Sequence, residues 1–277
     1  MAIEIPTLPE QMPNDASRYV GKAVNRVEDP ALVSGTVEFI DNFSLPGMLH
    51  CAILRSPHPH ARILSVKVDA ALAAEGVVAV LTGEDVGRWC NPCFTAPEGW
   101  GNYCLAVGKV RFVGEPVVAV AASSRYLAED ALELVDIEYE LLPPVADAGQ
   151  AMATGAPLVF EERGTNVMLD RTYTWGELER VFAEADRVVS RRFRWNRVGA
   201  NPTETFGCVC RWDLADNSLV CHGAYQTPRF MAIGRAASLN LPVNRVRIVT
   251  HPQGGGFGGK GGPRGTDIAA LLSRKSG

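Results

Sequence analysis

The residue run with the clearest chemical potential is QGGGFGGK, at 253–260. Within it, Gly254, Gly256 and Gly259 fit the pattern G-x-G-x-x-G of dinucleotide-binding loops. The span from Gly254 to Lys260 also fits the pattern G-x-x-x-x-G-K of triphosphate-binding loops. Both kinds of loop bring backbone N–H groups close to an anion, which glycine allows because it has no side chain.

Each of these two phosphate-binding interpretations lacks a residue that it requires. A triphosphate loop needs a serine or threonine after its lysine to hold magnesium, and Lys260 is followed by Gly261. A dinucleotide loop needs an acidic residue about 20 positions further on, at the end of a second strand. The sequence stops at Gly277, before such a strand. The glycines therefore predict a close approach to an anion or a bulky planar ligand, and a flexible glycine linker stays open as the alternative.

The cysteines do not form a recognisable set of metal ligands. The chain has seven cysteines; Cys90 and Cys93 lie close together, and Cys104 follows nearby. A zinc or iron–sulfur site usually takes four protein ligands, and no fourth cysteine is close. We therefore expect buried thiols and no metal held by protein side chains.

The composition is that of a globular protein of about two domains. Of the 277 residues, 47% are hydrophobic and 21% are charged. The net charge of -4 provides no basic field for a nucleic acid or an anionic membrane. No apolar run approaches the ~20 residues that span a bilayer, and the N-terminus lacks the features of a signal peptide. We expect a cytoplasmic protein that binds neither nucleic acid nor membrane.

Two parts of the chain must position the glycine loop. The first part follows a polar, proline-bearing stretch at 1–20, which we expect to be an N-terminal arm. Its short apolar runs, bounded by Gly, Pro or Asp, predict strands, and helical spacing of apolar residues predicts one helix at 126–135. The strands are expected at 36–40, 48–56, 61–68, 76–83, twice within 109–124, and at 135–143.

The second part follows a proline-rich crossover at 141–157. The run at 188–198 alternates apolar and basic residues, which predicts a strand with one solvated face. The glycine loop follows one strand and precedes a helix, a position where backbone amides can hold an anion. The other strands are expected at 207–212, 219–225 and 246–251, and helices at 177–186, 229–239 and 267–276.

Several stretches together resemble the large subunit of the molybdenum hydroxylases, the family of xanthine dehydrogenase, aldehyde oxidoreductase and carbon monoxide dehydrogenase. Residues 21–71 and 109–147 resemble the a/b hammerhead domain of that family. Residues 239–260, LNLPVNRVRIVTHPQGGGFGGK, resemble the beginning of its molybdopterin-binding domain, with Gln226 upstream in HGAYQTPRF. The resemblance runs from about Gly21 to the end of the sequence.

The resemblance implies an α+β fold and a specific cofactor. An a/b hammerhead domain is implied at 21–148, and the N-terminal portion of a molybdopterin-binding domain at 149–277. The cofactor would be a molybdopterin-type molybdenum cofactor, with the cytosine dinucleotide form as one option, in which the pterin carries the metal. Gln226 is implied as the catalytic glutamine beside the metal, because its amide can donate a hydrogen bond without adding charge. The residues implied to bind the cofactor are Gln226, Gly255, Gly256, Phe257 and Gly258.

The resemblance also implies an activity and partners. The activity would be a molybdenum-dependent hydroxylation of a small organic substrate, with water as the oxygen source. Electrons would pass through 2Fe-2S clusters to FAD, both expected on partner subunits. A further chain would complete the molybdopterin domain. The alternatives are a free-standing nucleotide- or phosphate-binding module and an inactive truncated subunit.

Two features depart from the family pattern. Members that act on purines carry a substrate-contacting glutamate directly after the loop lysine, where this chain has Gly261, so a purine substrate is not expected. The glutamate that serves as general base lies late in full-length subunits and has no counterpart in these residues. Glu204, in the stretch NPTETFG, is expected to be a hydrogen-bonding anchor and not that base.

Overall fold

The computed structural model describes residues 21–92, 95–196, 198–262 and 265–277. The arm expected at 1–20 and the thiol of Cys93 lie outside the described residues. The chain divides between Val37 and Glu38 into two units. The first unit contains α1 (Asp29–Ser34), which is capped by Gly35 in the left-handed conformation, with a φ of 70°.

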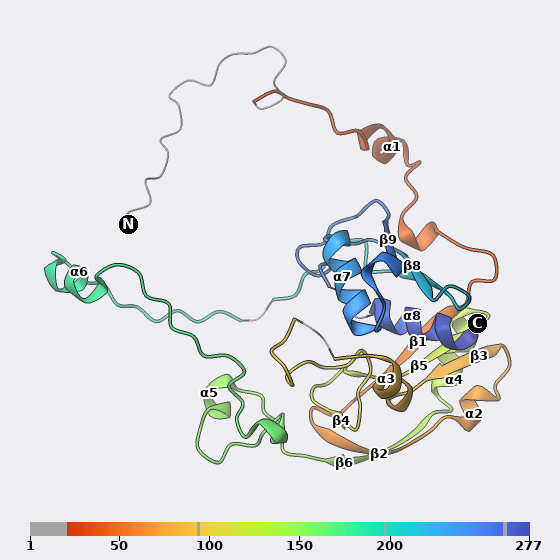
Figure 1. Ribbon diagram of the computed structural model, residues 1–277, viewed down its shortest axis with the longest axis horizontal. Helices are drawn as coiled ribbons and strands as arrows, with labels where there is room; N and C mark the ends of the chain where they lie inside the picture. Colours follow the sequence, from red (N-terminus) through yellow and green to blue (C-terminus); the bar gives the residue numbers. More distant parts are fainter. Residues whose placement is uncertain (1–20, 93–94, 197, 263–264) are drawn as a thin grey trace. The chain divides into compact units, whose positions relative to one another are not determined.

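The larger unit begins with an antiparallel sheet in the order β1-β5-β3 (Figure 1). Its central strand, β5 (Pro116–Ala122), reads PVVAVAA and is buried along almost its whole length. Pairing with β1 (His50–Arg55) and β3 (Val77–Leu81) satisfies both edges of this strand. Helix α4 (Arg125–Leu132) follows directly and is capped by Ser124, whose hydroxyl accepts a hydrogen bond from the third helical N–H.

A second antiparallel sheet has the order β4-β2-β6. Its strands are β4 (Lys109–Val110), β2 (Ala61–Lys67) and β6 (Asp136–Leu141). Across β2 and β6 the exposed faces carry opposite charges, including the pair Lys67–Asp136 at 2.9 Å.

The third sheet belongs to the second part of the chain and has the order β7-β8-β9. β7 (Cys208–Asp213) and β8 (Ser218–Gly223) form the predicted hairpin, with Asn217 in its turn at a φ of 51°. β8 then pairs in parallel with β9 (Val246–Thr250), so the chain between them must cross over. The crossover carries α7 (Pro228–Ser238), which lies beside β9 in Figure 1.

Helix α8 (Gly265–Ser276) joins the two parts of the larger unit. It packs on β7 and also on β3 and β5 of the first sheet (Figure 1). One hydrophobic core therefore contains Leu81 and Leu105 from the first part together with Leu219 and Leu271 from the second. Other short helices are α2 (Asp69–Leu72), α3 (Gly83–Trp89), α5 (Ala148–Ala151), η1 (Ile40–Asn42), η2 (Glu161–Arg163) and η3 (Val243–Arg245).

Most of the predicted elements are confirmed, and two predicted strands are wrong. The run at 36–40 contains no strand. Its only buried side chain is Ile40, which packs against Gly207, so that a Cβ added to Gly207 would lie 3.0 Å from a methyl carbon of Ile40. The run at 188–198 also contains no strand in its described residues. Its alternation indicates that one face of the run is apolar and suited to burial. A strand also needs a neighbouring strand to which it can hydrogen-bond, and no strand of the three sheets pairs with this run.

The segment around that second run is exposed throughout. Every described residue between 167 and 201 is exposed, including those of α6 (Leu178–Glu184) at the predicted 177–186 helix. The most exposed large apolar side chains include Val189 at 81%, Phe193 at 79% and Trp195 at 83%. In the part of the chain that the structure describes, no helix combines the length and the apolarity needed to cross a membrane.

Candidate functional site

The glycine loop lies directly after β9 and before α8, as the sequence predicts. Its first anchor is the backbone of His251, whose N–H donates to the carbonyl of Gly223 at the end of β8, at 3.0 Å. Gln226 follows three residues after Gly223, the last residue of β8. The parallel pairing of β8 and β9 thus brings Gln226 and the loop to one edge of the third sheet.

Gln226 holds the loop with both its main chain and its side chain. Its Oε1 atom accepts hydrogen bonds from the N–H groups of Gly258, at 3.0 Å, and Lys260, at 3.1 Å. Its own N–H donates to the carbonyl of Lys260 at 3.1 Å. Within the described residues, its amide nitrogen has no acceptor. Because the carbonyl oxygen is committed to the loop, the amide nitrogen is the end that remains to donate to a ligand.

Lys260 is buried and paired, which excludes it as a phosphate ligand. Its side chain is 1% exposed, and Nζ lies 2.6 Å from Oε2 of Glu204. The same oxygen accepts the N–H of Gly254 at 2.8 Å. The prediction that Glu204 is a hydrogen-bonding anchor is therefore confirmed, and the carboxylate clamps the first and last parts of the loop together.

Three consecutive N–H groups of the loop make no hydrogen bond within the described residues. They belong to Gly255, Gly256 and Phe257, three of the residues predicted to bind a cofactor. The fourth, Gly258, donates its N–H to Gln226 and so contributes to the shape of the loop. Phe257 has a φ of 48° and is 77% exposed. A left-handed conformation is uncommon outside glycine, and strained residues of this kind cluster at functional sites.

Two of the loop glycines are required by close packing. A Cβ on Gly254 would lie 2.6 Å from Cβ of Glu204, and one on Gly256 would lie 2.5 Å from Cδ of Gln226. Both distances are far shorter than van der Waals contact. Glycine at these positions therefore lets the side chains of Glu204 and Gln226 approach the loop backbone.

The donors on this loop fit an anionic group that carries its own metal. Backbone N–H groups and a neutral amide can hold an anion without adding charge, and they are not metal ligands. The described residues contain no group of three or more His, Cys, Asp or Glu side chains that could hold a metal ion. Cys90 and Cys104, two of the thiols considered as ligands, are buried; the hydrogen bond with Cys90, together with burial, raises the pKa of Cys104 well above its ordinary value.

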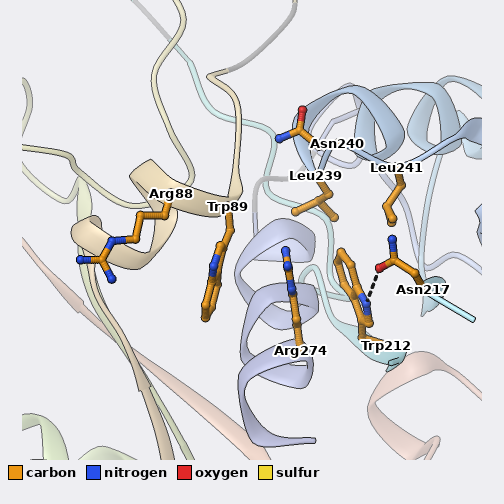
Figure 2. A pocket seen from close by; sticks show the side chains of 8 residues that line it. All are labelled: Arg88, Trp89, Trp212, Asn217, Leu239, Asn240, Leu241 and Arg274. Atoms are coloured by element: carbon orange, nitrogen blue, oxygen red, sulfur yellow. Dashed lines mark hydrogen bonds between the residues drawn. The ribbon is translucent and has the colours of Figure 1, made fainter. Parts of the chain in front are cut away.

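A separate cavity of about 210 Å³ lies away from the loop, between α3, α7 and α8. Figure 2 shows the guanidinium of Arg274 between the rings of Trp89 and Trp212 at this place. The guanidinium carbon lies 5.0 Å and 5.2 Å from the two ring centroids. This arrangement binds the two parts of the chain to each other.

Sequence reasoning found the loop and Gln226 but missed two features beside them. The pairing of Lys260 with Glu204 spans 56 residues, so no local spacing could reveal it. The contact between His222 and His251 was missed for the same reason. The one usable signal was that His222 lies within the predicted strand 219–225 and that His251 ends the predicted strand 246–251, which leads toward the loop.

Two family models match the chain, one on each side of the proline-rich crossover. The model for the aldehyde oxidase and xanthine dehydrogenase a/b hammerhead domain matches residues 34–143. The model for the molybdopterin cofactor-binding domain matches residues 159–277.

Curated relatives and solved structures agree with these matches. The nicotine 6-hydroxylase large subunit of Paenarthrobacter nicotinovorans is 34% identical over 87% of this chain and 30% of its own length. The carbon monoxide dehydrogenase large chain of Hydrogenophaga pseudoflava is 36% identical over 89% of this chain and 32% of its own length. The crystal structure of quinoline 2-oxidoreductase from Pseudomonas putida 86 aligns with 92% of this chain and 33% of its own, with a TM-score of 0.82 and 37% identity.

The chain spans about a third of the length of these relatives. The part that it spans contains both matched regions, the glycine loop and Gln226. The chain belongs to the molybdenum hydroxylase family, and it carries the hammerhead domain and the beginning of the cofactor-binding domain of that family's large subunit.

Proposed function

We propose that this chain forms part of the cofactor-binding subunit of a multi-subunit molybdenum hydroxylase that oxidises a small organic substrate. The observation that carries the proposal is the row of N–H groups at Gly255, Gly256 and Phe257, which have no hydrogen-bond partner among the residues that the structure describes, beside the amide nitrogen of Gln226, which has no acceptor among them either. We further propose that partner subunits carry 2Fe-2S clusters and FAD. The rest of the cofactor-binding domain would complete the site, on whichever polypeptide it is carried.

The residues of this chain would bind and orient the cofactor. The glycine loop offers fixed, neutral donors, which favour one arrangement of an anionic group at no cost in reorganisation. Gln226 would donate its amide N–H toward the metal end of the cofactor, in an orientation set by its two bonds to the loop. When bound, a molybdopterin-type cofactor supplies the two-electron redox chemistry and the activation of water.

Gly261 bears on the substrate class. It stands directly after Lys260, and it brings no carboxylate to the position where purine-oxidising relatives have one. We therefore favour a substrate other than a purine. A dinucleotide form of the pterin stays open within the proposal.

The test is the metal content of the assembled protein. The chain would be purified together with the polypeptides encoded beside it, and molybdenum would be measured by elemental analysis and the pterin by fluorescence after oxidation. We expect both in wild-type protein and in Gly262→Ala, and a loss of both in Gly256→Ala. An assembled complex without molybdenum would contradict the proposal.

The same preparation addresses the two alternatives. A free-standing nucleotide-binding module predicts that the isolated chain is monomeric and binds a nucleotide in calorimetry; the burial of Lys260 against Glu204 argues against it. An inactive truncated subunit predicts a chain that aggregates and forms no complex.

A further inference from the structure

Two histidines contact each other immediately before the glycine loop. His222 lies in β8, and His251 is the first residue after β9. Nδ1 of His222 and Nε2 of His251 are 3.3 Å apart, a hydrogen bond in which one ring nitrogen donates and the other accepts. Phe43 covers both rings, stacked on His222 at 4.4 Å between centroids and tilted on His251 at 4.7 Å.

The contact joins the two strand ends from which the candidate site begins. On one side, β8 ends at Gly223, and Gln226, whose side chain accepts hydrogen bonds from the loop, follows three residues later. On the other side, the loop begins at Gln253, two residues after His251. The backbone bond from His251 to Gly223 lies between them, so the imidazole contact and the backbone bond act on the same junction.

A metal ion bound between the two rings is the alternative to a hydrogen bond at this distance. Two nitrogens bound to one tetrahedral zinc ion would be roughly 3.3 Å apart, given bonds of about 2.0–2.1 Å. Two observations argue against a metal. The described residues provide no group of three ligands here, and the positive charges of Arg211 and Arg247 act on His222. We therefore interpret the contact as a hydrogen bond.

We propose that His222 and His251, covered by Phe43, are a positioning pair that holds the base of the glycine loop and releases it when both rings are protonated. A first added proton can reside on an outer ring nitrogen and leave the contact intact. After a second, all four ring nitrogens carry hydrogen, so both facing atoms are donors and the bond is lost. The consequence for a cofactor rests on the proposed function, but the effect on the loop does not.

The surroundings of His222 disfavour its protonation. Burial lowers the pKa of His222 below its ordinary value of 6.5, and positive charge on His251, Arg247 and Arg211 lowers it further. These charged groups lie on β7, on β9 and at the end of β9, while Phe43 on the remaining side is uncharged. The folded state favours the neutral ring, so the contribution is complete above pH 6.5 and is lost as the pH falls below it.

The experiment is amide hydrogen exchange of the full chain, without added cofactor, at pH 7.5 and pH 5.0. Rates would be expressed as protection factors, which remove the intrinsic effect of pH on exchange. The reporting amides are His251, Gly254 and Gly258, each hydrogen-bonded at or in the loop. Amides of the buried strand β5 report on global stability.

Three variants separate the roles. His222→Asn keeps a hydrogen-bonding atom near the position of Nδ1 but cannot be protonated. His222→Ala removes the contact. His58→Gln is the matched control, because His58 is also a partly buried ring beside an aromatic residue, Tyr139, but lies in the first part of the chain.

In wild-type protein and His58→Gln, we expect protection of the loop amides to fall about five-fold between pH 7.5 and pH 5.0, the value of one net hydrogen bond. In His222→Asn it should stay high at both pH values, and in His222→Ala it should be low at both. Wild-type protection in His222→Ala, or a pH-dependent fall in His222→Asn, would overturn the inference. If His222→Ala does not fold, the comparison of wild type with His222→Asn still decides. Loss of molybdenum binding with this exchange pattern intact would refute the proposed function alone.

Discussion

At the scale of single residues, the position of Lys260 adds a structural reason against the phosphate-binding interpretations, each of which already lacks a required residue in the sequence. A lysine after a glycine run is usually an anion ligand, but here its Nζ is enclosed and faces a carboxylate. A buried charge is tolerated only with a partner, so Lys260 and Glu204 must be present together. Lys260 therefore stabilises the conformation of the loop, and the backbone N–H groups of the loop are the groups that can bind a ligand.

Replacing Lys260 with methionine should therefore be strongly destabilising. The carboxylate of Glu204 would remain buried without its counter-charge, and we expect a loss of about 3–5 kcal/mol in the free energy of unfolding. The double variant Lys260→Met/Glu204→Gln should recover most of this loss, because the glutamine can still accept the N–H of Gly254. Urea denaturation followed by circular dichroism measures both values. Equal stability of the single and double variants would contradict a buried ion pair.

Gly256→Ala tests the contact between the loop and Gln226. The new Cβ would lie 2.5 Å from Cδ and 2.7 Å from Oε1 of Gln226, so the side chain must move and give up its bonds to Gly258 and Lys260. We expect about 1–3 kcal/mol of destabilisation in urea. Gly262→Ala is the control, since no atom lies within 4 Å of its added Cβ, and it should stay within about 0.5 kcal/mol of wild type.

These residues also show the extent of what sequence could reveal about the site. The glycines, Gln226 and the anchoring role of Glu204 follow from residue type and motif. Which N–H groups stay free does not, because that depends on where the carbonyl of a glutamine more than thirty positions upstream is placed. Such a contact is made by the pairing of β8 with β9, and no spacing in the sequence encodes it.

At the scale of elements, the predictions succeed where an element finds its neighbours within the chain. The strands of all three sheets and the helices α4, α7 and α8 are found where the sequence predicts them. The run at 188–198 has a clear two-residue period, yet its described residues form no strand. A two-residue period indicates which side chains lie on one face of a possible strand. Those side chains are buried only where another strand or helix packs against that face.

Exposed apolar residues in that run should contribute nothing to the stability of this chain. Phe193→Ser combined with Trp195→Ser should leave the free energy of unfolding within about 0.5 kcal/mol of wild type, because both side chains are about four-fifths exposed. Trp212→Ser is the matched control: Trp212 is 4% exposed, and its loss should cost about 3–5 kcal/mol.

The same pair of substitutions should change association. Contiguous exposed apolar surface promotes aggregation, so sedimentation velocity should show fewer large species for the double variant than for wild type at equal concentration. A marked loss of stability in the double variant would mean that the segment packs against the rest of the chain in solution.

At the scale of the whole described molecule, the two regions matched by separate family models share one buried cluster, and the first region has two smaller clusters of its own. Residues of the first sheet and residues of β8, α7 and α8 belong to one buried cluster. Polar contacts cross the same boundary: Asn91 donates to Asn240 at 2.7 Å, and Lys275 pairs with Asp85 at 2.7 Å. The larger unit should therefore unfold in one cooperative step.

Arg274 is the residue best placed to test this cooperativity. Its guanidinium lies between Trp89 of α3 and Trp212 of β7, and so connects both regions (Figure 2). Arg274→Ala should lower the free energy of unfolding by about 1–3 kcal/mol, since two cation–π contacts are lost from a partly buried position. Arg229→Ala, at an exposed arginine of α7, should change it by less than about 0.5 kcal/mol.

The decisive measurement for Arg274→Ala is which amides lose protection from hydrogen exchange. Hydrogen exchange should show that amides of β5 and amides of β8 lose protection by the same factor, although only β8 belongs to the same region as Arg274. A loss confined to β8 would show that the two regions open independently. Because α8 packs on β3, β5 and β7 at once, weakening its hold at Arg274 must release both sheets together.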